Sequence, residues 1–104
     1  MVAQESVENT YKVKGDLLET TLYYDNGNVA QMGFYTKDRN PHGEWVSFNR
    51  NGKKTAIAQY DNGKKVGTWV FFQGDTRKEV RYLDSKILEV KTLEVIDSRV
   101  VTYK

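Results

Sequence analysis

The stretch Gly43-Glu44-Trp45-Val46-Ser47-Phe48-Asn49 decides the fold, because Gly67-Thr68-Trp69-Val70-Phe71-Phe72-Gln73 repeats its pattern 24 residues later. Each stretch has a glycine, a tryptophan two residues on, and an aromatic residue three residues after the tryptophan. Tyr35 and Tyr60 match at an offset of 25, so we expect one more loop residue in the earlier copy. A weaker first copy begins near Tyr11. Repeats of this length predict supersecondary units that bury their apolar faces against one another, here one β-hairpin per copy.

Three Asn-Gly pairs predict the turns of these hairpins, at Asn26-Gly27, Asn51-Gly52 and Asn62-Gly63. Asn-Gly supplies the two positive-φ residues of a tight type I′ turn. The expected strands cover residues 18–24, 29–35, 45–49, 54–60, 68–72 and 78–83. A two-residue turn at Asn51-Gly52 would pair Phe48 with Thr55 and Val46 with Ile57. The residues 40–43 are expected to form a turn, and a last hairpin over 86–103, turning at Asp97-Ser98, would oppose Val95 to Val100.

Composition supports an all-β chain. Val, Ile, Thr, Tyr, Phe and Trp number 37 residues, whereas Ala and Leu together number 10, and this bias favours strands over helices. A length of 104 residues indicates a single domain, 1–104. We expect an antiparallel meander of stacked β-hairpin repeats forming an elongated twisted sheet. Repeats of about 24 residues would span 11–83, with Thr20 in the place of Thr68, and 84–104 would form a C-terminal capping hairpin.

The residue inventory excludes most enzyme classes. The chain has no cysteine and one histidine, His42, so it has no thiolate nucleophile and no metal site built on Cys or on paired His. His42 precedes Glu44 and Trp45, but no second carboxylate or nucleophile lies at a predictable distance. We therefore expect a turn histidine, no catalytic residues, no metal and no cofactor. No apolar run approaches the roughly 20 residues of a transmembrane helix.

The ordered motifs resemble a known family. Tyr24-Asp25-Asn26-Gly27, Gly33-Phe34-Tyr35, His42-Gly43-Glu44-Trp45 and Asn51-Gly52-Lys53, followed by a second copy over 60–69, are similar to the MORN repeat in its bacterial variant form, of the YwqK-like antitoxin type. The second copy departs from the pattern with Val66 in the place of His42, and the third copy lacks Gly-x-Trp. The resemblance implies an elongated antiparallel sheet and a binding, scaffold or membrane-proximal role.

Two groups of side chains are candidate binding residues. Aromatic residues recur in register and form either a core between hairpins or an exposed platform for sugars, bases or apolar side chains; they are Trp45, Trp69, Tyr24, Phe48 and Phe72. Basic residues flank two turns and would meet at one end of the sheet; they are Arg50, Lys53, Lys54, Lys64 and Lys65. Residues 50–81 carry a net charge of +5, against −3 before them and 0 after them. An acidic protein or an anionic lipid surface would suit the basic group, and nucleic acid is not expected.

These observations favour a non-enzymatic module for protein–protein or membrane-proximal contact. The alternative is an exported envelope module that binds a small ligand, glycan or lipid through its aromatic face. The opening Met1-Val2-Ala3 fits either a cytoplasmic start or the mature start of an exported chain. Because an imperfect cap would leave a strand edge open, a homodimer through the sheet edges is also expected.

Overall fold

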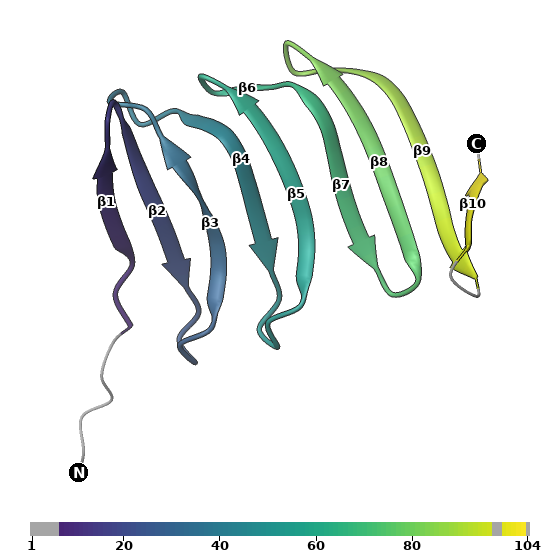
Figure 1. The fold of residues 1–104 in the computed structure, drawn as a ribbon, viewed down its shortest axis with the longest axis horizontal. Coiled ribbons are helices and arrows are strands. Elements are labelled where there is room, and N and C mark those ends of the chain that lie inside the picture. Colours follow the sequence, from purple (N-terminus) through teal and green to yellow (C-terminus); the bar gives the residue numbers. More distant parts are fainter. Residues whose placement is uncertain (1–6, 97–98, 104) are drawn as a thin grey trace.

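The computed structural model describes residues 7–96 and 99–103, which form one open antiparallel sheet (Figure 1). The strands are β1 (Thr10–Lys14), β2 (Leu17–Tyr23), β3 (Val29–Tyr35), β4 (Pro41–Phe48), β5 (Lys54–Asp61), β6 (Lys64–Lys65), β7 (Gly67–Gln73), β8 (Thr76–Leu83), β9 (Lys86–Ile96) and β10 (Arg99–Tyr103). They follow one another across the sheet, except that the short β6 pairs only with β5. The all-β meander expected from the sequence is confirmed.

The sheet is a single layer. Its extents are 52 × 36 × 19 Å, and the shortest is close to the thickness of one sheet with its side chains on both faces. The first edge of the described sheet is β1, whose five residues are all exposed, and the last is β10. No second sheet or helix covers either face within the described residues. The core therefore has to be built from side chains that lie along the sheet surface.

Two of the three Asn-Gly turns differ from the predicted type I′. Of these three pairs, only Asn62-Gly63 has positive φ at both residues, 47° and 90°. The other two Asn-Gly pairs lie in three-residue loops, 24–28 and 49–53. In each loop the N–H of the first residue donates to the carbonyl of the last, the N–H of the glycine donates to the carbonyl of the first, and only the glycine has positive φ. This geometry is a type I turn followed by a G1 bulge, which Asn-Gly also satisfies. The prediction of type I′ turns at Asn26-Gly27 and Asn51-Gly52 is therefore wrong.

The pairing register of the strands depends on the geometry of these turns. Val46 pairs with Ile57 as predicted, but Phe48 pairs with Lys54 instead of Thr55, because the bulge shifts the register after Ser47. At the C-terminal end Val95 opposes Val100 as expected, whereas the turn predicted at 97–98 lies outside the described residues. Pro41 starts a strand instead of lying in a turn, which suits proline because the first residue of a strand can lack an N–H donor.

Two loops of different length explain the change in repeat offset. Residues 36–40 form a three-residue loop between β3 and β4, whereas β5 and β6 are joined by the two-residue turn Asn62-Gly63. The expected extra loop residue is therefore confirmed. The turn geometry also corrects the alignment of the first copy: Thr20 lies four residues before the 24–28 loop, as Trp45 lies four before 49–53. Thr20 thus takes the place of a tryptophan and not of Thr68.

Candidate functional site

One face of the sheet, here called the tryptophan face, carries Trp45 and Trp69. Their exposed fractions are 7% and 8%, although no second layer of the described residues covers them. Each tryptophan follows a positive-φ glycine in a bulge opposite a small residue, which is Gly33 for Trp45 and Ala58 for Trp69. A Cβ added at Gly33 would lie 2.2 Å from the Trp45 ring. Each ring therefore lies flat over the preceding strand and covers its backbone.

Hydrogen bonds fix both rings in the same way. The Trp45 indole N–H donates to the Phe34 carbonyl at 2.9 Å, and the Trp69 indole N–H donates to the Gln59 carbonyl at 2.9 Å. The next residue in each preceding strand is a tyrosine that packs edge-on against the indole, with centroid distances of 4.9 Å for Tyr35 and 5.1 Å for Tyr60. The repeated motif is thus a structural unit, and it makes these two tryptophans the core.

The candidate aromatic residues do not form one continuous platform. Trp45 and Trp69 are buried, whereas Phe72 lies three residues after Trp69 and so on the opposite face. The Tyr24 hydroxyl donates to the Phe48 carbonyl at 2.7 Å and joins the first two copies at their turns. These positions show how each residue is held. Whether any of them also contacts a partner stays a prediction.

The expectation that the basic residues meet at one end is wrong. Arg50, Lys53 and Lys54 lie at the β4–β5 turn, whereas Lys64 and Lys65 lie beyond the other end of β5, where Figure 1 places β6. The eight-residue strand β5 runs from the first group to the second, so the two groups lie at opposite ends of this strand. There is no single basic end.

Two of these cations are also engaged within the protein. Arg50 forms an ion pair with Asp25 and lies over the Tyr24 ring, 5.4 Å from its centroid. The Lys65 ammonium lies 4.8 Å from the Trp69 ring centroid and 5.3 Å from that of Tyr82. Cation–π contacts of this kind stabilise the aromatic array. Lys53, Lys54 and Lys64 are exposed and are the basic residues most accessible to a partner.

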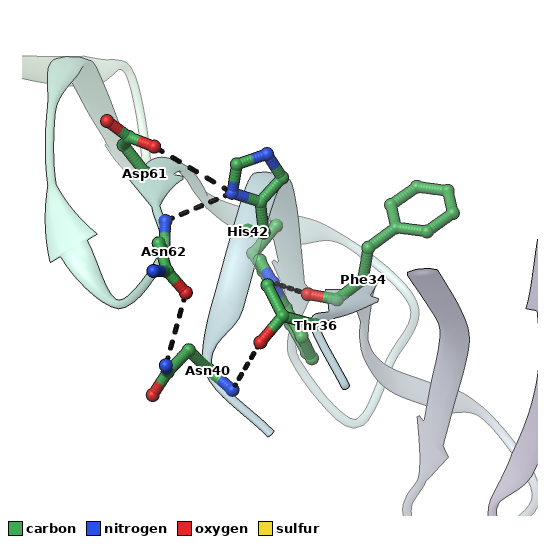
Figure 2. Close-up of polar contacts among 7 residues, drawn as sticks. Phe34, Thr36, Asn40, His42, Asp61 and Asn62 are labelled. Atoms are coloured by element: carbon green, nitrogen blue, oxygen red, sulfur yellow. Dashed lines mark hydrogen bonds and ion pairs between the residues drawn. The ribbon is translucent and has the colours of Figure 1, made fainter. Parts of the chain in front are cut away.

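His42 belongs to a polar cluster that joins two copies (Figure 2). Its Nδ1 accepts a hydrogen bond from the Asn62 backbone N–H at 3.0 Å. The side chains of Asn40 and Asn62 are joined at 3.1 Å, and the Gly63 N–H donates to the Pro41 carbonyl at 2.8 Å. Asp61 Oδ1 lies 4.0 Å from the same Nδ1, beyond hydrogen-bond distance. The imidazole therefore positions the Asn62-Gly63 turn.

The face opposite the tryptophans, here called the reverse face, was not singled out from the sequence. An apolar row crosses four of its strands through successive cross-strand pairs, and its members are Met32, Val46, Ile57 and Val70, here called the reverse stripe. Met32 is 44% exposed, and the other three are half-buried. A hollow of about 270 Å³ adjoins the stripe, with Glu19 and Glu44 in its lining. The sequence does contain a signal for this face, because along each strand these apolar residues alternate with the residues of the tryptophan face.

Among the described residues, the side chain of Tyr60 has a shifted pKa. Burial raises the pKa of Tyr60 above its ordinary value of 10.0, and the neighbouring phenols of Tyr35 and Tyr82 raise it further. The three tyrosines lie on the tryptophan face at the ends of β3, β5 and β8, so ionised forms would repel one another. Tyr60 is therefore held neutral as part of the core.

Two kinds of site are absent from the described residues, a metal-binding cluster and a membrane-spanning helix. Among them, no three His, Cys, Asp or Glu side chains gather closely enough to hold a metal ion. Within the same ranges, no helix has the length and apolar character needed to cross a membrane.

Comparisons with known proteins do not indicate a function, so a function has to be inferred from the geometry. No family model, no curated protein and no solved structure matches this chain. The arrangement itself offers a broad, thin sheet with one face occupied by its own core and the other partly apolar and uncovered.

Proposed function

We propose that this chain is a non-enzymatic repeat module that binds a protein partner across the reverse face of its sheet. The observation that carries the proposal is the reverse stripe, a row of apolar side chains over four neighbouring strands with no covering layer among the described residues. Contiguous exposed apolar surface on a soluble protein is commonly an interaction site. The MORN-like spacing supports the same reading, because that resemblance implies binding and scaffold roles.

The size of the face is sufficient for a specific interface. With in-plane extents of 52 and 36 Å, one face exceeds the roughly 800 Å² that a standard interface buries on each partner. The paired strands also present their side chains on a regular lattice, since neighbouring strands lie about 4.8 Å apart. A partner can therefore contact several copies at once.

Charge indicates the chemistry of the partner. Glu19 and Glu44 line the hollow beside Met32 and Val46, and Glu44 is exposed. An apolar side chain entering this hollow would bring its neighbours close to two carboxylates. We therefore expect the partner to present an apolar residue flanked by Lys or Arg, because complementary charge steers association and fixes its register.

Two matched variants test this assignment. Met32→Lys with Ile57→Thr places a charge and a hydroxyl on the reverse stripe, whereas Gln31→Lys adds the same charge to the neighbouring residue on the tryptophan face. Partners are captured from native extract with the wild type and both variants, and each candidate is then purified and titrated by calorimetry. We expect a partner that binds the wild type and Gln31→Lys alike and loses at least tenfold in affinity for the stripe variant.

The alternatives give different results. Partners that bind all three proteins equally would refute the reverse face as the contact. Sedimentation with phosphatidylserine vesicles, lost on changing Lys53 and Lys54 to Glu and unaffected by the stripe variant, would identify an anionic lipid surface instead. Unfolding curves for every variant confirm that each comparison is made on folded protein.

A further inference from the structure

The aromatic array on the tryptophan face is interrupted in the first copy. Trp45 fills the space next to Tyr35, and Trp69 fills the space between Tyr60 and Tyr82. In the first copy the corresponding residue is Thr20, which is fully buried and carries no ring. A hollow of about 440 Å³ lies beside this position, and its lining residues are Tyr11, Leu18, Tyr35 and Arg39. We call it the first-copy slot.

The walls of the slot are two phenol rings on different strands. Tyr11 belongs to the edge strand β1 and is 53% exposed, and it pairs across the sheet with Thr20. Tyr35 belongs to β3 and pairs with Leu18, so that Leu18 lies between the two rings on the same face. The edge-on contact with Trp45, at 4.9 Å and 64°, holds the Tyr35 ring in place. One wall is therefore rigid and the other borders solvent.

Arg39 occupies a backbone position that favours glycine. It is the fourth residue of the 36–40 loop and has φ 65°, whereas the equivalent residues of the two sister loops are Gly27 and Gly52. A non-glycine residue in the left-handed region is strained, and such strain is concentrated at functional sites. The arginine at this position brings a guanidinium to the slot that glycine would not supply.

That guanidinium has no ion-pair or hydrogen-bond partner among the residues that the structure describes. The other arginines between residues 7 and 96 each lie beside a carboxylate, and these pairs are Arg50 with Asp25, Arg77 with Glu79, and Arg81 with Glu89. Within that range Arg39 is the one arginine with no recorded ion pair or side-chain hydrogen bond. The nearest acidic residue in the adjoining hollow is Asp16, which is engaged by Lys37 at 3.4 Å. The slot therefore ends in a guanidinium whose hydrogen-bond donors are not engaged by a carboxylate of the described residues.

We propose that the first-copy slot binds a ring that carries a carboxylate. The ring would lie over Leu18 between the Tyr11 and Tyr35 phenols, which can pack against an aromatic ring or against the apolar face of a sugar ring. The carboxylate would accept two parallel hydrogen bonds from the Arg39 guanidinium, whose planar fork matches its geometry. Aromatic acids and sugar acids share this chemistry. The slot lies on the opposite face from the reverse stripe, so this inference stands or falls independently of the proposed protein interface.

Two probes and four proteins test the proposal. Nitrogen-15-labelled protein is titrated with 2-naphthoate and, separately, with glucuronate, and amide shifts are followed by NMR. The variants are Arg39→Gly, Arg39→Lys and the control Lys53→Gln, which removes one positive charge at the other end of the sheet. Arg39→Gly should fold at least as well as the wild type, because glycine is the residue of the sister loops. A loss of binding in this variant cannot then be ascribed to unfolding.

We expect changes in amide chemical shift that saturate with added ligand and are confined to Tyr11, Leu18, Tyr35 and their neighbours. Arg39→Gly should weaken binding at least tenfold, Arg39→Lys should weaken it less, and Lys53→Gln should leave it unchanged. Saturation by 2-naphthoate alone identifies aromatic acids as the ligand class, and saturation by glucuronate alone identifies sugar acids. Absence of saturation with both probes, or equal binding by the wild type and Arg39→Gly, would overturn the proposal.

Discussion

Gly33→Ala is the sharpest test of how the single-layer sheet builds its core. The added Cβ would lie 2.2, 2.4 and 2.5 Å from three atoms of the Trp45 ring. Carbon atoms in contact are normally 3.5 to 4.0 Å apart, so the indole would have to move by more than 1 Å, as a rough estimate. Such a movement would break its hydrogen bond to the Phe34 carbonyl and its contact with Tyr35.

The expected cost is about 2 kcal/mol. Overpacking a tight site costs about 1–3 kcal/mol, and losing the buried indole hydrogen bond adds about 1 kcal/mol. Against this, alanine restricts the unfolded chain more than glycine does and recovers about 0.4–1 kcal/mol. For a domain of this size, a loss of about 2 kcal/mol lowers Tm by about 10 °C.

Urea unfolding followed by tryptophan fluorescence and by circular dichroism measures this change. The same substitution is made in a Trp45→Phe background, where the smaller ring leaves room for the new methyl group. We expect Gly33→Ala to cost at least about 1 kcal/mol less there, which is the coupling that a double-mutant cycle reports. An equal cost in both backgrounds, or a change below about 0.5 kcal/mol in the wild type, would refute the account of the indole lying on the glycine.

Three further predictions concern stability. Arg39→Gly should raise the free energy of unfolding by about 0.5–1 kcal/mol by relieving the left-handed backbone, and a lower Tm would show that the side chain supports its loop. Because the pKa of Tyr60 is raised in the folded state, the unfolded chain loses this proton first as the pH rises above about 10. Stability should therefore fall between that pH and the folded pKa, and Tyr60→Phe should flatten this fall in urea titrations. Lys65→Glu should cost about 1–2 kcal/mol by removing the contacts with Trp69 and Tyr82, whereas Lys64→Glu should stay within about 0.5 kcal/mol on thermal unfolding.

The sequence was sufficient for the strands because hairpin pairing is a local property. Val46 opposes Ile57 for a reason that is visible in the chain, since both are β-branched and lie at similar distances from an Asn-Gly pair. The same reasoning placed Val95 opposite Val100. Even the change of offset between Tyr35 and Tyr60 could be predicted as a loop difference, because one added loop residue shifts the copy without changing its strands.

Turn type could not be predicted in the same way, because contacts between copies contribute to it. Asn-Gly fits both a two-residue type I′ turn and a three-residue loop with a G1 bulge. In the 49–53 loop, the carbonyl of Arg50 accepts hydrogen bonds from the side chains of Asn26 and Asn28, which belong to the previous copy. These partners lie more than twenty residues away, and no local pattern indicates that they meet. Phe48 was assigned the wrong partner for this reason.

The basic residues illustrate a different limit. They are close in sequence and carry the same charge, so a count of net charge groups them. In the structure, however, Lys54 begins β5 and Lys64 lies beyond its other end. Eight strand residues at about 3.3 Å each separate the two ends by about 26 Å. Following the expected strand 54–60 from one turn to the next would have placed the two groups at opposite ends of the sheet. By contrast, the cation–π position of Lys65 depends on the bulge before Trp69, and this feature is not apparent from the sequence.

The same geometry gives the two faces of the sheet different roles. A single-layer sheet has no opposite layer to bury its apolar residues, so it must cover one face with its own side chains. The bulges at Gly43 and Gly67 allow this, because each positions an indole flat over the neighbouring strand. The part of this face around the two indoles is then committed to stability, and changes to Trp45, Trp69 and their packing partners should mainly affect folding. The reverse stripe makes no comparable interlocking contacts, so changes there should mainly affect binding, and the stripe and glycine variants together measure that separation.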